Sequence, residues 1–382
     1  SREPGSERFS SLSPSAAIRF KRLGRPSSMQ TCIRILFFFF IIIPINANFV
    51  DGRVFSSSRL RQIAQNGDGS TRTFALGVIS DQDKQSALGN GTWLSVFRRG
   101  NLSLSADNTR AEVVFDFFDH RLLSRIGING RGMELSDLVI FDNRLLTVDD
   151  RTGIIYEIKE GARIIPWLVL ADGDGSDPSR RFKGEWMTVK DGALFVGSHG
   201  RLNWDKKGNP DDRMMWVKRV DKRGGVTHLS WAARYRMILA SLAVHTPPGY
   251  VTHEAVQWSE TQRRWFFLPR RISRTLYTSV DDSHRGAGIL LSVDEHFSQP
   301  PRIVKIGRDN SAGFEGHSAL GFSAFQFVPT TNEQLVIALK TLEENDDVVA
   351  SFVTVFNATT GAVLLNPQPL QGTRKFEGIC FL

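Results

Sequence analysis

The chain has 382 residues, enough for two or three domains of average size, although a repeat or all-β fold of this length can form a single one. Its 41% of hydrophobic and 23% of charged residues are close to the globular average and exclude a wholly disordered chain or a coiled coil. The net charge of +8 includes a surplus of five positive charges in residues 1–47, and the remaining three do not indicate a nucleic-acid partner.

The N-terminal region is typical of a leader followed by a secretory signal. Residues 1–28 are rich in Ser, Pro and Arg and show no periodicity, which indicates an upstream or disordered leader. Residues 29–47 start with Met, contain the apolar run 35–43 and end at Ala47, which predicts a signal peptide cleaved near that residue. A spanning helix needs about twenty apolar residues, so we expect a secreted or lumenal chain without a stable membrane span. An uncleaved anchor is the alternative.

The mature chain is expected to consist of a linker over 48–72 and one domain over 73–382. Cleavage of the signal removes Cys32 and leaves Cys380 without a partner, so the two cysteines exclude a scaffold stapled by disulfides. In a secreted chain, sequons on surface loops are candidate glycan sites, and three of them begin at Asn90, Asn101 and Asn357.

From Thr73 onward the chain reads as short strands separated by Gly, Asn and Asp. Long helical patterns are absent, and the best helical stretch lies near Trp231 to Leu242. This pattern predicts an all-β domain, in which internal repeats are expected.

Four hairpin-like segments share one pattern. Each opens with a Ser or Glu, has apolar residues two and four positions later, and continues through a turn into a second strand. In a strand these three positions lie on one face, so a polar residue stands at the end of an apolar stripe. The segments begin at Ser136, Glu185, Glu254 and Ser323, and the last stretch, from Glu377, fits the same register.

The spacing of these starts indicates the blades of a propeller. The intervals are 49, 69, 69 and 54 residues, at or above the roughly forty to fifty residues of a four-stranded blade. The strand at Glu377 has no partner after it, whereas residues 74–81 resemble a second strand. We therefore predict an all-β, five-bladed β-propeller closed by pairing of the N- and C-terminal strands, which hides exposed sheet edges. An irregular β-sandwich is the alternative.

The five polar residues would converge on the axis, because the innermost strands of a propeller line it. Three carboxylates in one channel repel each other unless a cation lies among them. Oxygen ligands in this number suit Ca²⁺, and the sequence has no His and Cys set for zinc. For any single Glu, a solvated strand end remains the alternative, and the shared register is what favours the metal.

Seven ordered motifs between about Phe74 and Leu382 closely resemble the soluble calcium-activated nucleotidases, also called calcium-dependent apyrases. They are Met133-Glu-Leu-Ser-Asp-Leu138, Val148-Asp-Asp-Arg-Thr-Gly153, Asp172-Gly-Asp-Gly175, Phe182-Lys-Gly-Glu-Trp186, Trp265-Phe-Phe-Leu-Pro-Arg-Arg271, Gly321-Phe-Ser323 and Phe376-Glu-Gly-Ile379. The resemblance implies a five-bladed propeller of the secretory pathway that hydrolyses nucleoside di- and triphosphates with Ca²⁺. Blood-feeding arthropods use such enzymes against ADP, and vertebrate members prefer UDP and GDP, so ADP, UDP, GDP and ATP are the implied substrates.

The resemblance also implies site residues. It places calcium ligands on the five register positions and an adjacent Asp, namely Ser136, Asp137, Glu185, Glu254, Ser323 and Glu377. It matches the Asp-x-Asp motif of the family to Asp81-Gln82-Asp83. The chain departs from residues common in the family at Gly184, Gly288 and Cys380, where Ala, Asn and an acidic residue are frequent.

The expected reaction is hydrolysis of a phosphoanhydride, with Ca²⁺ bridging phosphate oxygens and neutralising the charge of the leaving phosphate. A carboxylate would orient or deprotonate the attacking water, and the catalytic candidates are Asp81, Asp83 and Glu185. Cations should rim a site for a polyanion, and the substrate-binding candidates are Arg151, Lys183, Arg271 and Lys340. Trp186 either stacks on a base or packs in the core.

Two other functions remain open from the sequence. One is a calcium-stabilised propeller that binds a partner without turnover, and the other is a calcium-dependent propeller hydrolase of esters or lactones. Phosphate release from ADP with Ca²⁺, and its loss with a chelator, separates the three. The sequence does not indicate which nucleotide is preferred.

Overall fold

The computed structural model describes residues 71–382, except 178, 205–206, 308–315, 317 and 345–346. The expected leader and signal peptide, and nearly all of the expected linker, lie outside the described residues. The described residues belong to one compact unit, 52–382. In the part of the chain that is described, no helix has the length and apolar composition needed to cross a bilayer.

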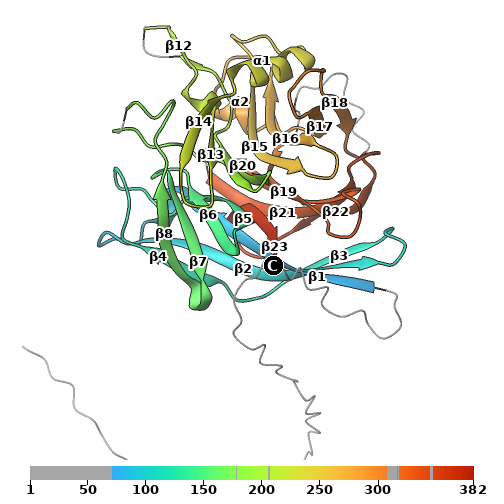
Figure 1. The fold of residues 1–382 in the computed structure, drawn as a ribbon. Coiled ribbons are helices and arrows are strands. Elements are labelled where there is room, and N and C mark those ends of the chain that lie inside the picture. The colour runs from blue at the N-terminus through green and yellow to red at the C-terminus, as the bar shows by residue number, and fades with distance from the viewer. Residues whose placement is uncertain (1–70, 178, 205–206, 308–315, 317, 345–346) are drawn as a thin grey trace, which may run out of the picture. The chain divides into compact units, whose positions relative to one another are not determined.

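Five sheets of four or five strands form this unit, and each is one blade of a β-propeller (Figure 1). Blade 1 contains, from the inside outward, β23 (Lys375–Phe381), β1 (Thr71–Asp81), β2 (Trp93–Ser105) and then both β3 (Ala111–Phe115) and β4 (His120–Ser124). Blade 2 contains β5 (Leu135–Phe141), β6 (Arg144–Asp149), β7 (Ile154–Lys159) and β8 (Arg163–Val169). Blade 3 contains β9 (Trp186–Lys190), β10 (Ala193–Gly197), β13 (Trp216–Val220) and β14 (Val226–Ser230).

Blade 4 contains β15 (Tyr250–Ser259), β16 (Arg264–Ser273), β17 (Ile289–Asp294) and β18 (Arg302–Lys305). Blade 5 contains β19 (Leu320–Phe327), β20 (Leu335–Glu344), β21 (Asp347–Asn357) and β22 (Val363–Pro369). The remaining elements are the hairpin β11 (Asn203–Trp204) and β12 (Pro210–Asp211), the helices α1 (Ala232–Ser241) and α2 (Ser279–Asp282), and short 3-10 turns at Asp83–Ser86, Glu160–Ala162 and Arg213–Met215. The prediction of a five-bladed, nearly all-β fold is confirmed.

The predicted closure of one blade by both ends of the domain is also confirmed. β23 pairs antiparallel with β1, with Leu76 opposite Phe381 and Ile79 opposite Gly378. The innermost strands then form a ring in the order β23, β5, β9, β15 and β19, in which each lies beside the next. Gly378 permits a close approach of β23 to its neighbours, because a Cβ atom there would lie 2.6 Å from the carbonyl carbon of Asp137 and from Cγ2 of Ile79.

The apolar stripes of the repeats fill the spaces between neighbouring blades. Leu138 is buried between blades 1 and 2, Met187 between blades 2 and 3, and Val256 between blades 3 and 4. Phe325 and Ile379 do the same between blades 4 and 5 and between blades 5 and 1. Because a slip of one residue would turn each stripe out of its core, this packing fixes the register of the inner strands.

β-bulges interrupt four of the five inner strands at the polar residue that opens each repeat. On the inner strands the pairing skips Ser136 together with Asp137, and it skips Glu254, Ser323 and Glu377. The fifth, Glu185, lies just before β9, and its N–H donates to the carbonyl of Gly197 at 2.8 Å. A bulge releases a residue from strict alternation and re-aims its side chain. The polar residue can therefore face the axis while the rest of the stripe faces a core.

A buried lysine supports the connection between β8 and β9, which carries Lys183 and Glu185. Lys218 of β13 is fully buried, its ammonium donates to the carbonyl of Gly173, and it lies 2.9 Å from Nδ1 of His228. Burial lowers the pKa of Lys218 to about 8.

Removal of residues 376–382 should prevent cooperative folding, because it deletes most of β23 and opens the ring. Gly378→Ala keeps the strand and should still lower the melting temperature, since the new Cβ meets the backbone of Asp137. Thermal unfolding followed by circular dichroism measures both. A truncated chain that retains the cooperative transition of the parent would contradict the closure.

The pH dependence of stability should reveal Lys218. The pKa of this group is lower in the folded chain than the 10.5 of a free lysine. Between the two values the unfolded chain holds the proton that the folded chain has released, so the free energy of unfolding should rise with pH. Relative to Lys218→Met, the parent should gain up to about 2 kcal/mol between about pH 7.5 and about pH 9.5. Parallel stability curves for the two proteins would show that Lys218 titrates normally.

Candidate active site

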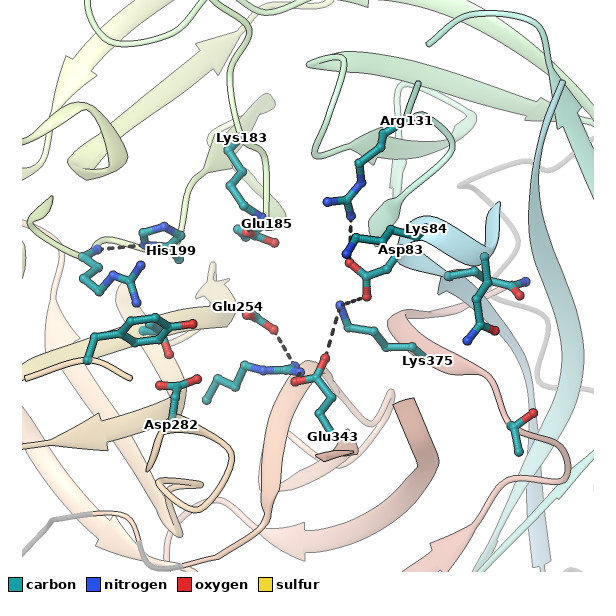
Figure 2. Close-up of a pocket in the computed structure, with 17 residues that line it drawn as sticks. Asp83, Lys84, Arg131, Lys183, Glu185, His199, Glu254, Asp282, Glu343 and Lys375 are labelled. Carbon is teal, nitrogen blue, oxygen red and sulfur yellow. Dashed lines mark hydrogen bonds and ion pairs between the residues drawn. The ribbon is translucent and has the colours of Figure 1, made fainter. Parts of the chain in front are cut away.

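A polar cavity of about 650 Å³ lies at the axial ends of the inner strands (Figure 2). Most of its lining side chains carry a charge, and they come from blades 1, 3, 4 and 5 and from the segment before β5. The described lining residues are Gln82, Asp83, Lys84, Gln85, Arg131, Lys183, Glu185, His199, Arg201, Thr252, Glu254, Arg270, Tyr277, Asp282, Glu343, Thr373 and Lys375.

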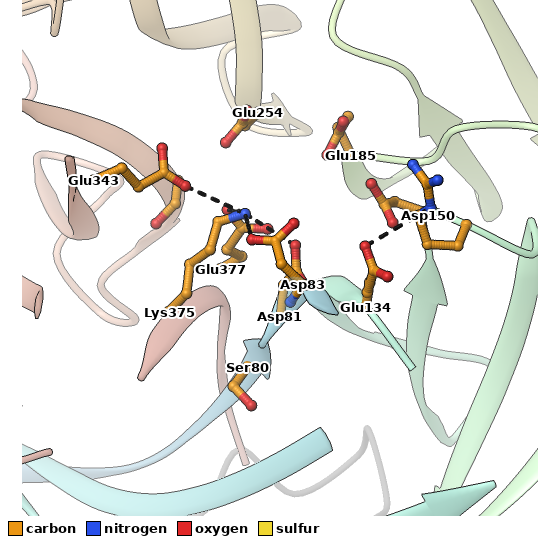
Figure 3. A network of polar contacts seen from close by, with 12 residues as sticks. Ser80, Asp81, Asp83, Glu134, Asp150, Glu185, Glu254, Glu343, Lys375 and Glu377 are labelled. Carbon is orange, nitrogen blue, oxygen red and sulfur yellow. Dashed lines mark hydrogen bonds and ion pairs between the residues drawn. The ribbon is translucent and has the colours of Figure 1, made fainter. Parts of the chain in front are cut away.

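Three glutamates at repeat starts, Glu185, Glu254 and Glu377, gather around the axis (Figure 3). Burial raises the pKa of all three, that of Glu185 to about 8, and a neighbouring carboxylate raises each further. Glu254 acts in this way on both Glu185 and Glu377. We call these three glutamates and the two serines at the other repeat starts, Ser136 and Ser323, the ring. Ionisation of its glutamates is unfavourable unless positive charge lies close by.

Lys375 supplies positive charge at the centre of this group (Figure 3). Its ammonium lies 3.1 Å from Glu377, 3.0 Å from Asp81, 3.2 Å from Asp83 and 3.4 Å from Glu343. Burial disfavours the charged lysine, but these carboxylates outweigh burial and hold its pKa well above the usual value. One cation thus joins acidic groups of blades 1 and 5.

Two further cations compensate the carboxylates on the other side. Arg270 donates to Glu254 at 2.6 Å. Lys183 pairs with both Asp150 and Glu185, and these partners raise its pKa well above the usual value although burial opposes them. Both cations line the cavity, so they are accessible to an anion that enters it.

The two repeat starts without a carboxylate are the serines Ser136 and Ser323. Ser136 Oγ is buried and has no hydrogen-bond partner among the described residues. Ser323 Oγ donates to the carbonyl of Phe376 at 3.0 Å. Asp137, next to the first serine, has a different environment, because its carboxylate accepts backbone N–H groups, one of them from Met187 at 2.6 Å. This aspartate ties β5 to β9.

The donor set of this ring fits a hard divalent cation. Carboxylate and hydroxyl oxygens in this number are the ligands that Ca²⁺ prefers. Burial and neighbouring carboxylates both raise the pKa values of Glu185 and Glu377, and Ser136 adds a buried hydroxyl that has no partner among the described residues. The residues that could hold the ion are Ser136, Glu185, Glu254, Ser323 and Glu377.

A second acidic group lies beside the ring. One carboxylate oxygen from each of Asp81, Asp83 and Glu134 lies within 4.8 Å of the others. The backbone N–H of Asp83 donates to Asp81 at 2.7 Å, and Arg131 donates to Asp83 at 3.0 Å and to Glu134. Burial, and then repulsion from Asp81, raise the pKa of Glu134 to about 8. Of the three acidic side chains, Asp83 is the one that lines the cavity.

The structure separates the four cations that the sequence proposes for substrate binding. Lys183 lines the cavity, whereas Arg151, Arg271 and Lys340 are not among its described lining residues. Arg271 is fully buried. The ammonium of Lys340 lies over the ring of Phe322, 4.3 Å from the centroid.

Trp186 packs in the core between blades 3 and 4. It is fully buried, and its indole N–H donates to the carbonyl of Ser198 at 3.1 Å. The rings of Trp231 and Trp265 lie 5.6 and 6.5 Å from it. Of the two roles considered for this tryptophan, core packing is the one observed.

Sequence reasoning missed several residues of the cavity. Arg270 and Arg271 are adjacent on β16 and face opposite sides of the sheet. Alternation alone does not tell which of them faces the axis. In the structure the pairing of β15 with β16 skips both Glu254 and Arg270, so these two unpaired residues meet. Glu343 follows a similar irregularity between β20 and β21 and matches no repeat position. Lys375 lies two positions before the repeat start Glu377, and this closeness in sequence is the signal that could have pointed to it.

His199 and Asp282 lie on the side of the cavity away from Asp83 (Figure 2). The guanidinium of Arg201 lies 4.3 Å from the ring centroid of Tyr277. The backbone N–H of Arg201 donates to Nδ1 of His199 at 3.1 Å, and burial holds the pKa of His199 well below its usual value. A neutral imidazole that accepts at Nδ1 carries its proton on Nε2. These residues follow β10 or lie between β16 and β17, in connections without a repeat pattern, so the sequence did not single them out.

A carboxylate outside the cavity holds two of the segments that line it. Asp119 accepts hydrogen bonds from Arg98 and Arg374, both at 2.7 Å. Arg374 also donates to Gln82 at 3.0 Å. The turn that carries Gln82 and the strand that begins at Lys375 are thereby fixed to each other.

Comparison with known proteins identifies the family. The sequence profile of the apyrase family matches residues 80–382. The chain is 41% identical to soluble calcium-activated nucleotidase 1 of Mus musculus over 312 residues, which cover 81% of this chain and 74% of the mouse protein. It is 39% identical to apyrase apy-1 of Caenorhabditis elegans over 82% of this chain and 86% of that protein, and 39% identical to the apyrase of Cimex lectularius over 81% and 82%. The chain belongs to the apyrase family.

Proposed function

We propose that this chain is a calcium-dependent hydrolase of nucleoside di- and triphosphates that acts in the secretory pathway or outside the cell. The observation that carries the proposal is the axial cavity, in which oxygen ligands for a hard cation lie beside cationic side chains suited to phosphate. The relatives named apyrase and calcium-activated nucleotidase support the same activity. The apolar run 35–43, which precedes the described residues, supports secretion.

The size and lining of the cavity favour a small polyanion over a protein partner. Its volume of about 650 Å³ is within the range of small-molecule sites. Most of its lining residues are charged, and the cations Lys183, Arg270 and Lys375 all reach it. A nucleoside polyphosphate supplies the negative charge that these cations can bind.

Ser136, Glu185, Glu254, Ser323 and Glu377 would hold the calcium ion. When bound, the ion supplies charge neutralisation for the phosphate oxygens.

The side chains of this chain have separate tasks in the reaction. Lys183 and Arg270 bind the phosphates and orient the scissile anhydride for attack. Asp83 holds the attacking water and accepts its proton, because it is the catalytic candidate that lines the cavity without belonging to the calcium ring. Arg131 and Lys375, at 3.0 and 3.2 Å, hold its two carboxylate oxygens in place. Asp81 fixes the turn by accepting the N–H of Asp83.

The purified chain should release phosphate from ADP, UDP, GDP or ATP when Ca²⁺ is present and stop when a chelator is added. Glu254→Gln makes this test specific, because it keeps the shape of the side chain and removes one charge from the calcium ring. The Ca²⁺ concentration for half-maximal activity should rise about tenfold or more. Chelation should lower the melting temperature of the parent more than that of the variant, since bound metal stabilises the folded state.

The control is Glu260→Gln, which changes an exposed glutamate in the turn of the same strand pair. It should leave the calcium dependence unchanged. Superimposable calcium curves for the parent and Glu254→Gln would remove Glu254 from the ring. Calcium binding without phosphate release from any nucleotide would favour a propeller that binds a partner without turnover.

Lys183 and Lys340 form a matched pair for the phosphate contact. Lys183→Met should lower kcat/KM for nucleotides at least about tenfold, because it removes a cation that lines the cavity. It should not raise the calcium requirement, since the partner Glu185 loses a competing cation. Lys340→Met, which alters a lysine placed over Phe322, should change kcat/KM by less than about twofold. Equal losses in the two variants would refute the assignment of the phosphate side of the cavity.

A further inference from the structure

We infer that a second cavity, between blades 4 and 5, binds the phosphate or sulfate ester of a small molecule and that Arg264 and Arg302 hold its anionic group. This cavity has a volume of about 220 Å³. None of its described lining residues also lines the axial cavity. The inference therefore concerns a separate site and does not depend on the proposed hydrolysis.

The register of blade 4 brings the two arginines to this cavity. Phe266 of β16 lies opposite Ser292 of β17, and Ser292 lies opposite Arg302 of β18. Residues directly opposite each other in antiparallel strands have their side chains on the same face, and so do residues two positions apart on one strand. Arg264 therefore shares this face. Residues 358–359 of blade 5 line the cavity as well, so both blades contribute to its wall.

The two guanidinium groups have only neutral partners among the described residues. Arg264 donates to the backbone carbonyl of Ser292 at 2.9 Å. Arg302 donates to the backbone carbonyl of Thr359, in blade 5, at 3.3 Å. A guanidinium carries five N–H donors, so each arginine retains donors for a ligand. Within the described part of the chain, neither forms an ion pair with a carboxylate, and the described lining of the cavity contains no acidic residue.

The carboxylates nearest in the fold are committed to other groups. Asp294 lies opposite Arg264 in the strand register, but its two oxygens accept the backbone N–H groups of three residues in the turn 296–299. Glu333 accepts the side-chain amide of Gln262 at 3.2 Å. Neither carboxylate is among the described lining residues. The negative charge that would balance the two arginines is thus left for a ligand to supply.

The two arginines favour a tetrahedral oxyanion. A guanidinium binds carboxylate, phosphate and sulfate oxygens in pairs. A carboxylate has two oxygens, which one guanidinium occupies, whereas the ester of a phosphate or sulfate has three free oxygens that two arginines can share. The cavity therefore suits a phosphate or sulfate group better than a carboxylate.

The remaining space of the cavity favours an ester over the free ion. A phosphate or sulfate group fills only part of the 220 Å³. Phe266 and Leu290, which also line the cavity, belong to the buried core between blades 4 and 5 and give it an apolar floor. Ser292 and Thr359 add hydroxyl groups to the lining. A small carrier with apolar and hydroxyl surfaces, such as a monosaccharide, can occupy this part.

Calorimetric titration of glucose 6-sulfate into the purified protein tests the inference, because a sulfate ester is not a substrate of the proposed hydrolysis. The parent should bind it more tightly than inorganic sulfate and should not bind glucose. Arg302→Met removes one guanidinium from an exposed position and should raise Kd at least about tenfold. Arg264→Met should raise Kd in the same way and provides a second, independent variant.

Two control variants locate the binding. Arg163→Met alters an exposed arginine that begins β8, the outer strand of blade 2, as Arg302 begins β18, and it should keep the parent Kd. Lys183→Met alters the axial cavity and should also keep the parent Kd.

The absence of binding by the parent, or an equal Kd for the parent and both arginine variants, would overturn the inference and leave the proposed hydrolysis intact. Binding that Lys183→Met abolishes would overturn it by placing the anion in the axial cavity. Equal affinity for inorganic sulfate and glucose 6-sulfate would overturn the assignment of an ester. Nucleotide hydrolysis by Arg302→Met should match that of the parent, since this arginine lies outside the axial cavity.

Discussion

The repulsion among buried carboxylates at the axis is the constraint on which the rest of the structure depends. Glu185, Glu254 and Glu377 come from three blades. Burial raises the pKa of all three, and Glu254 raises those of Glu185 and Glu377 further. Buried like charges are tolerated only when cations meet them at short range. Lys183, Arg270 and Lys375 do so, and each lies at a position fixed by the fold. The closed ring of inner strands is what keeps these six groups from moving apart.

In the proposed function, two of these cations connect the axial carboxylates to the phosphates of the substrate. Arg270 and Lys375 both contact Glu343, so part of their charge is already paired when the cavity is empty of phosphate. Although burial opposes it, this contact lowers the pKa of Glu343. In the proposed function, an entering phosphate would compete with Glu343 for these two donors. In the proposed function, the charged end of the cavity recognises the phosphates.

The sequence predicted the parts of the fold that repeat. The alternation that places Leu138, Met187 and Val256 in inter-blade cores recurs in every blade, so the blade number, the closure and the five axial positions followed from it. Positions that depend on a bulge or on an irregular connection could not be predicted from this alternation. Arg270 rather than Arg271 faces the axis because the pairing skips Glu254 and Arg270 together, and no local pattern encodes that choice. Tyr277 and Asp282 lie in a connection that no other blade shares, so no repeat could mark them.

The closure by β1 and β23 also determines when the fold and the axial acidic groups can be completed during synthesis. Lys375 and Asp81 meet across a separation of 294 residues, and Glu377 follows two residues later. Blades 2 to 5 must be synthesised before the inner strand of blade 1 is available. Contacts between residues this far apart in the sequence form slowly. Until then one edge of β1 is unpaired, and unpaired strand edges promote aggregation. The last step that completes the fold is also the step that completes the acidic ring, so an unfinished chain has neither.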